Sequence, residues 1–310
     1  MTELLETGVK HSAALLRSFN FLKAKILRPI VERLIQLQFV RNGSKHRYVF
    51  VLAHMRSGST LLTHLLANNP NFVQAGESFL TYNTPGDLQK LVIEVCRRLR
   101  KLHLSASYVI DQVNHPFVAD EVLNSTLIYK CFILVRSPES AIKSLIAHQA
   151  ILANLPIKTP AFLLRASAKT DSTAEWDMST IKKAAIDYYV NRLGELAKCG
   201  ALLGPRAMLV EYNNLVDFPE RTLAAISEFL GATQHFDVNY TPTRITGKGF
   251  GDASRNIFVG RIIRTEPHNV EISAEDLAHV SAAYQDCLQR LRLSDVQFAN
   301  GELTVGWEES

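Results

Sequence analysis

Nearly continuous apolar runs alternate along this chain with segments whose apolar residues recur every three or four positions. The run YVFVLAH, which ends at His54, is typical of a central parallel strand covered on both faces. Further strands are predicted at residues 72–75, 127–135 and 207–211. Helices are predicted at residues 60–68, 86–103, 138–152, 180–203, 219–230 and 273–291. Strands that alternate with helices indicate an α/β protein with three layers, α/β/α, around a central parallel sheet.

The two ends of the chain depart from this alternation. Residues 1–45 are predicted to form an N-terminal basic amphipathic helical arm, because Lys and Arg stand between apolar positions at helical spacing in residues 12–40. The arm either packs on the main domain or rests its basic face on a membrane surface or a partner. The main domain is expected at residues 46–295, with a C-terminal tail at 296–310. Residues 153–179, rich in Pro, Ser and Thr, are typical of a lid or binding loop.

Composition narrows the class of protein. A chain of 310 residues with 47% apolar content can bury a large core, and a net charge of +4 is too mild to indicate a nucleic-acid partner. The four cysteines show no CxxC spacing, which favours reduced thiols. No apolar stretch reaches the roughly 18 to 20 residues of a membrane span, and no signal-peptide pattern is present. We therefore expect a cytoplasmic protein; the sequence carries no signal for an oligomeric state.

A first anion-binding loop is predicted where the opening strand gives way to Arg56-Ser57-Gly58-Ser59-Thr60. Gly58 permits a tight turn, and Thr60 begins a helix whose free N–H groups and positive dipole end point into that turn. The hydroxyl groups of Ser57, Ser59 and Thr60 add hydrogen-bond donors. Arg56 adds a cation that can grip a phosphate or a sulfate.

A second anion-binding segment follows the strand LIYKCFILV, which ends in Arg136. P-loop nucleotide triphosphatases carry a metal-binding Asp on a comparable strand and a Lys in the first loop, where this chain has Ser59. A cation in place of the Asp suits an anionic group and predicts no metal. A helix begins at once, with Pro138 near its start, and brings Ser144 onto a face that Arg136 can share. Two such sites on neighbouring strands predict a ligand phosphorylated at two separated points.

The two motifs, in this order and 80 positions apart, resemble those of the sulfotransferases that use 3'-phosphoadenosine 5'-phosphosulfate (PAPS). In that family [KR]-S-G-[ST]-T binds the 5'-phosphosulfate, and R-x-P-x-x-x-x-x-S binds the 3'-phosphate. Arg56 to Thr60 match the first motif, and Arg136 with Ser144 match the second. The likeness covers about residues 46–260 and implies a P-loop-like sulfotransferase fold.

Two downstream segments add to this resemblance. Tyr212, in AMLVEYNNLVDFPERTL, matches a family Tyr that lies by the adenine. The segment GKGFGD resembles the Gly-rich loop that closes over the 3'-phosphate, with Lys248 and Arg255 as its clamps. The implied activity is transfer of the sulfuryl group from PAPS to a hydroxyl or an amine of a small-molecule acceptor. The transfer would be in line, use no metal and leave 3',5'-bisphosphoadenosine (PAP).

Arg56 would stabilise the charge that develops on the departing phosphate, and a general base must take the acceptor's proton. Two residues are candidates. Glu77, in VQAGES, resembles the carboxylate base of tyrosylprotein-type and some carbohydrate sulfotransferases. His115, in QVNHPF, resembles the catalytic His of the cytosolic small-molecule branch, although Val113 and Met55 replace that branch's Lys and Pro. We place His115 slightly ahead for a small-molecule acceptor.

Two other function classes stay open at this point. A P-loop kinase would share the strand-loop-helix, and a non-catalytic nucleotide-binding module would share the anion sites without the chemistry. For the sulfotransferase, the acceptor would be a secondary metabolite, a sugar or a lipid. Its pocket is expected at residues 78–115 and 153–179, which the motifs do not cover.

Overall fold

The computed structural model describes residues 29–30, 32–34, 46–115, 118–153, 177–242, 255–264 and 268–299. Most of the predicted N-terminal arm, most of the segment at 153–179, and Lys248 lie outside the described residues. Arg255 is described in its backbone alone. The predicted sulfotransferase-like region from residue 46 onward is thus covered by the structure, apart from residues 116–117, 154–176 and 243–254.

In the described part of the chain, six parallel strands form one sheet in the order β2-β3-β1-β4-β5-β6. The strands are β1 Arg47–Ala53, β2 Phe72–Val73, β3 Tyr108–Val113, β4 Ile128–Val135, β5 Ala207–Glu211 and β6 Gln297–Phe298. The parallel sheet with helices on both faces confirms the predicted α/β class. β6 pairs with β5, so the sheet extends into the residues that were expected to form the C-terminal tail.

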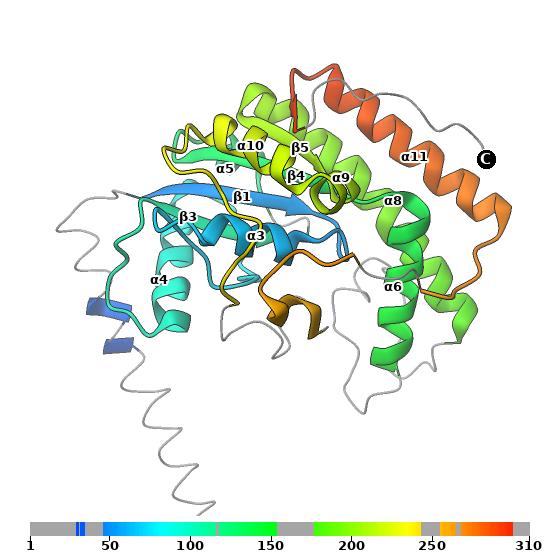
Figure 1. Cartoon of the computed structure of the whole chain (residues 1–310), viewed down its shortest axis with the longest axis horizontal. Helices are drawn as coiled ribbons and strands as arrows, with labels where there is room; N and C mark the ends of the chain where they lie inside the picture. The colour runs from blue at the N-terminus through cyan, green and yellow to red at the C-terminus, as the bar shows by residue number, and fades with distance from the viewer. Residues whose placement is uncertain are drawn as a thin grey trace, which may run out of the picture.

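Helices cover both faces of this sheet (Figure 1). They are α3 Ser59–Ala67, α4 Leu88–Leu99, α5 Asp120–Asn124, α6 Pro138–Ala153, α8 Met178–Leu203, α9 Tyr212–Asp217, α10 Pro219–Leu230 and α11 Ala274–Arg292, with 3-10 turns η2 Pro85–Asp87, η3 Gly204–Arg206 and η4 Arg255–Val259. All six helices predicted from the sequence are present. β3, β6 and the short helices α5 and α9 were not predicted.

Alternate residues of β1 enter two separate hydrophobic cores. Val49 and Val51 pack in the core that includes side chains of α3 and α10. Phe50 and Leu52 pack in the core that includes side chains of α4, α5, α6, α8 and α11. Side chains of a strand point to opposite faces in turn, so burial on both faces produces the nearly continuous apolar run of β1.

The chain reverses its direction of travel across the sheet between β1 and β4. It leaves β1 through α3, on one face, and reaches β2 at one edge. It leaves β4 through α6, on the opposite face, and continues toward β5. In Figure 1 the arrowhead of β1 points toward α6 and α8. The carboxyl ends of β1 and β4 therefore form the topological switch point, where open α/β sheets bind their ligands.

Within the described residues, every helix is too short or too polar to qualify as a membrane span.

Candidate functional site

The loop between β1 and α3 has a backbone shaped by two residues with positive φ. Arg56 has φ 64° and Gly58, the N-cap of α3, has φ 91°. A Cβ atom on Gly58 would lie 2.4 Å from Cδ2 of Tyr212. Gly58 is needed here on two counts, because the left-handed conformation favours it and because the Tyr212 ring lies against its backbone. The first N–H groups of α3 lack partners within the helix and open toward this loop.

Side chains from both predicted anion-binding segments meet at this loop. Nη1 of Arg136 donates a hydrogen bond to the backbone oxygen of Arg56 at 3.2 Å, and its Nε donates to Oγ of Ser140 at 2.8 Å. Nε of Arg56 donates to Oγ of Ser144 at 3.2 Å. The Arg136 guanidinium lies over the Tyr212 ring, 4.4 Å from its centroid. Residues 80 positions apart in the sequence thus form one cluster, which we call the arginine cluster: Arg56, Arg136, Ser140, Ser144 and Tyr212.

The arginine cluster carries concentrated positive charge. Burial, and beside it the charge of Arg56, lower the pKa of the Arg136 guanidinium. Among the described residues, no carboxylate forms an ion pair with Arg136. Burial, and next the charges of Arg56 and Arg136, lower the pKa of His268, which lies in the segment before α11. An anion bound here would be attracted by both guanidinium groups.

His54, the residue after β1, joins the ends of two neighbouring strands. Its Nε2 accepts a hydrogen bond from the backbone N–H of Arg136 at 3.0 Å, and its Nδ1 lies 2.8 Å from the Met55 oxygen, which assigns the proton to Nδ1. Burial lowers the pKa of His54 to about 3, so the ring is neutral. Tyr189 packs edge-on against it and donates to the Arg136 oxygen at 2.8 Å. His54 therefore links the ends of β1 and β4.

The three hydroxyl groups predicted in the first loop have different surroundings. Oγ of Ser59 donates to Oδ1 of Asn114, and Oγ1 of Thr60 donates to Oε1 of Gln112, both at 3.3 Å. These two hydroxyls tie α3 to the end of β3. Oγ of Ser57 is buried without a hydrogen-bond partner in the described part of the chain. Ser57 is thus the hydroxyl in this loop whose hydrogen bonding is still to be satisfied.

Glu77, one candidate base, follows β2, and Asn114 connects it by hydrogen bonds to Ser59 at the start of α3. Nδ2 of Asn114 donates to Oε2 of Glu77 at 3.5 Å, and the same Asn114 side chain accepts from Ser59. Burial, and next the negative charge of Asp111, raise the pKa of the Glu77 carboxyl to about 8. A carboxyl with this pKa is mostly protonated at neutral pH and is a strong proton acceptor once ionised.

His115, the other candidate base, follows β3 and is adjacent in sequence to Asn114. Burial, and next the positive charge of Arg192, lower the pKa of His115 to about 4. Arg192 comes from α8, and it donates to the backbone oxygens of Ala53 at 3.0 Å and of Val113 at 2.9 Å. Burial and the nearby charge of Arg192 thus keep His115 neutral, and a neutral His of low pKa is a weak base.

Several residues of this site were not found from the sequence. Ser140 lies one helical turn before Ser144 and accepts a hydrogen bond from Nε of Arg136. Its spacing from Arg136 on the following helix is a signal that could have found it. His268 and Arg192 reach the site from distant parts of the chain, and no local motif marks them. The predicted clamps Lys248 and Arg255 contribute no described side chain.

Neither similarity to known proteins nor a group of metal ligands among the described residues indicates a function for this site. No protein-family model matches the chain, and a search of curated proteins finds no match. Within the described ranges, no group of three or more His, Cys, Asp and Glu residues could hold a metal ion. The arrangement of the site itself, with paired arginines beside β1 and β4 and buried acids beside β2 and β3, is the basis for a functional argument.

Proposed function

We propose that the protein is a PAPS-dependent sulfotransferase with a P-loop-like sulfotransferase fold. One observation carries the proposal: Arg56, Arg136 and Tyr212 converge at the switch point of the sheet. PAPS carries anionic groups at its 5' and 3' positions, and two guanidinium groups with an adjacent aromatic ring suit such an adenosine-based ligand.

In this proposal the site binds the donor at both ends. Arg56 and the first N–H groups of α3 would hold the 5'-phosphosulfate, with the buried hydroxyl of Ser57 as a further donor. Arg136 and Ser144 would hold the 3'-phosphate, and Tyr212 would lie by the adenine. Binding would replace the hydrogen bond between Arg56 and Ser144 by contacts with the ligand.

The chemistry follows from these positions. An acceptor oxygen or nitrogen attacks the sulfur, a new bond to sulfur forms, and the bond from sulfur to the bridging phosphate oxygen breaks. Negative charge grows on that bridging oxygen, where Arg56 and the α3 N–H groups stabilise it. The acceptor's proton goes to a base. We propose Glu77 in its ionised form, because its pKa near 8 makes it a stronger base than His115, with a pKa near 4.

The small-molecule acceptor is proposed to be a secondary metabolite, a sugar or a lipid, with no nucleic-acid partner. A cytoplasmic location is part of the proposal. The four cysteines are free, as is usual for thiols in a reducing compartment.

Calorimetry with PAP and with ATP-Mg²⁺ tests the donor. We expect PAP to bind more tightly than ATP-Mg²⁺, and Arg136→Ala to weaken PAP binding at least tenfold, about 1.5–3 kcal/mol for a hydrogen bond to a charged group. Arg290→Ala is the matched control, because Arg290 pairs with Asp286 on the exposed side of α11. Preference for ATP-Mg²⁺ would favour a P-loop kinase. Tight PAP binding without turnover across a broad acceptor panel would favour a non-catalytic nucleotide-binding module.

A further inference from the structure

Arg98, near the end of α4, binds the main chain of the loop that carries Glu77. Its Nη1 donates to the backbone oxygens of Ala75 at 2.9 Å and of Glu77 at 2.7 Å, and its Nη2 donates to that of Ser78 at 3.3 Å. The Arg98 side chain is 8% exposed. One buried guanidinium thus satisfies three carbonyl groups of this loop that would otherwise need water.

The opposite side of the same loop is held by β3. Asp111 accepts the backbone N–H of Ser78 at 3.1 Å on Oδ1, and it accepts Oγ of Ser78 and the hydroxyl of Tyr82 on Oδ2, both at 2.6 Å. Asp111 is fully buried in the sheet. Two charged residues therefore fix the loop from Ala75 to Ser78. Arg98 of α4 binds its carbonyl groups, and Asp111 of β3 binds the N–H group of Ser78.

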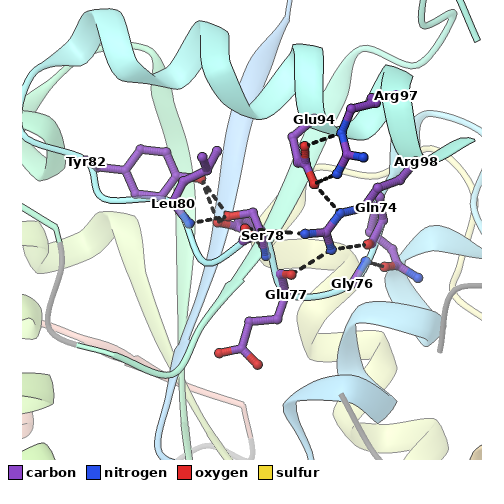
Figure 2. A network of polar contacts seen from close by, with 11 residues as sticks. Gln74, Gly76, Glu77, Ser78, Leu80, Tyr82, Glu94, Arg97 and Arg98 are labelled. Atoms are coloured by element: carbon purple, nitrogen blue, oxygen red, sulfur yellow. Dashed lines mark hydrogen bonds and ion pairs between the residues drawn. The ribbon is translucent and has the colours of Figure 1, made fainter. Parts of the chain in front are cut away.

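Figure 2 shows how the Glu77 side chain lies relative to these contacts. The backbone oxygen of Glu77 faces Arg98, whereas the carboxyl group extends away from Arg98 and Glu94. The carboxyl group accepts a hydrogen bond from Asn114, which in turn accepts one from Ser59, in the loop between β1 and α3. Fixing the main chain of Glu77 therefore sets where its carboxyl group stands.

Arg97 offers a natural comparison on the same helix. Both arginines bind Glu94, Arg97 through its Nε at 2.8 Å and Arg98 through its own Nε. In Figure 2 Arg97 lies on the far side of Glu94 from the Glu77 loop. Removing Arg97 takes away a cation of α4 and leaves the contacts between Arg98 and the loop in place.

We propose that Arg98 is a positioning residue for Glu77, which holds the loop from Ala75 to Ser78 so that the Glu77 carboxyl group stays buried beside Asn114. The inference rests on the proposed function in one respect, the assignment of Glu77 as the base. The positioning itself can be tested without any activity.

The sign of a pKa change separates positioning from a simple charge effect. The charged and titratable groups that face Glu77 are Asp111 of β3, Arg98 of α4, and Arg192 and Tyr188 of α8. Burial is the largest cause of the raised pKa of Glu77, and the charge of Arg98 acts in the opposite direction. Loss of the Arg98 charge alone would therefore raise the pKa further. Release of the loop into water would lower it toward the ordinary value of 4.5.

The experiment is a carboxyl-carbon NMR titration of the full chain with labelled glutamate, in which the Glu77 signal is identified by its loss in Glu77→Gln. We expect an inflection near pH 8 in the unaltered protein, and the same inflection in Arg97→Ala. Arg98→Ala should lower the Glu77 pKa by about one unit or more, a tenfold change in proton affinity. A pKa that stays or rises in Arg98→Ala would overturn the proposal.

Arg98→Lys is the second variant, should Arg98→Ala fail to fold. Lys keeps the charge, but a single ammonium group lacks the planar fork that spans three carbonyl oxygens. We expect a smaller decrease of the Glu77 pKa in the same direction; an unchanged value would count against positioning.

Activity and donor binding distinguish this proposal from the proposed function. Arg98 binds Glu94 and the loop that carries Glu77, whereas the proposed donor contacts come from the arginine cluster and Ser57. PAP affinity should therefore be the same in Arg98→Lys and in the unaltered protein, while kcat falls at least tenfold. If the unaltered protein neither binds PAP nor transfers sulfuryl groups, the proposed function fails, and the titration still decides whether Arg98 positions Glu77. Equal kcat in Arg98→Lys and Arg97→Ala would refute the catalytic consequence.

Discussion

Replacing Glu77 by Gln should make the protein more stable at pH 8 and change its stability little at low pH. Gln has almost the same shape as Glu and keeps an oxygen that can accept the hydrogen bond from Asn114. It carries no charge to be buried. The variant therefore removes the cost of ionising a carboxyl group in the site and little else.

The magnitude follows from the shift of the Glu77 pKa from 4.5 to about 8. A group whose folded pKa is raised contributes stability that is fully present below its unfolded pKa and is lost as the pH rises through the folded value. Between these two pKa values the folded state binds one more proton than the unfolded state, and the free energy of unfolding falls by about 1.4 kcal/mol per pH unit. From pH 6 to pH 8 the unaltered protein should lose about 2 kcal/mol relative to Glu77→Gln.

Urea unfolding of the two proteins at pH 6, 7 and 8 measures this difference. Comparing the two proteins at each pH cancels the contributions of other titrating groups, such as the buried His54 and His115, as long as the substitution leaves them unchanged. We expect the two unfolding midpoints to diverge steadily with rising pH, and the slopes with urea to stay equal. Parallel curves across the three pH values would show that the Glu77 carboxyl ionises in the folded protein as it does in water, and the argument for a raised pKa would fail.

Two further predictions concern catalysis and the donor loop. If Glu77 is the base, the rate of sulfuryl transfer should rise with pH through about 8. If His115 is the base, the rate should be constant from pH 6 to 9. Assays of Glu77→Gln and His115→Ala decide between the two. Gly58→Ala should lower the unfolding free energy by about 1–3 kcal/mol through its left-handed backbone alone, and should weaken PAP binding, because the added Cβ displaces Tyr212. Calorimetry with PAP and thermal unfolding check this, and unchanged values in both would contradict the close packing of the Tyr212 ring on Gly58.

The elements that the sequence predicted are those whose patterns are local and long. β1 and β4 are apolar because both faces are buried, and the long helices show their period directly. β3 was missed because Asp111 and Gln112 interrupt its apolar run, YVIDQV. The structure explains both polar residues: Asp111 accepts hydrogen bonds from Ser78 and Tyr82, and Gln112 accepts one from Thr60. Such compensation comes from other elements and has no local signature.

Within the site, the motifs predicted which residues lie near one another, but not which side chains form hydrogen bonds with each other. Arg136 and Ser144 were predicted to face the same anionic group; in the structure Arg136 donates a hydrogen bond to Ser140, and Ser144 accepts one from Arg56. Sequence spacing fixes which residues lie near a strand end, whereas side-chain pairing depends on how two loops pack. The same holds for Arg192, whose role depends on the packing of α8 against the ends of two strands.

The positive and negative side chains of the site lie at different strands of the sheet. Arg56 and Arg136 lie at β1 and β4, whereas Glu77 and Asp111 lie at β2 and β3. A transfer reaction needs positive charge where the leaving group becomes negative and a proton acceptor on the side from which the acceptor attacks. Arg192, buried between the two halves, bonds to the strand ends of both β1 and β3 and so keeps their spacing. The proposed in-line transfer between two partners requires this separation, and it would give a role to the buried carboxyl group of Glu77, whose pKa is raised, across from the arginines.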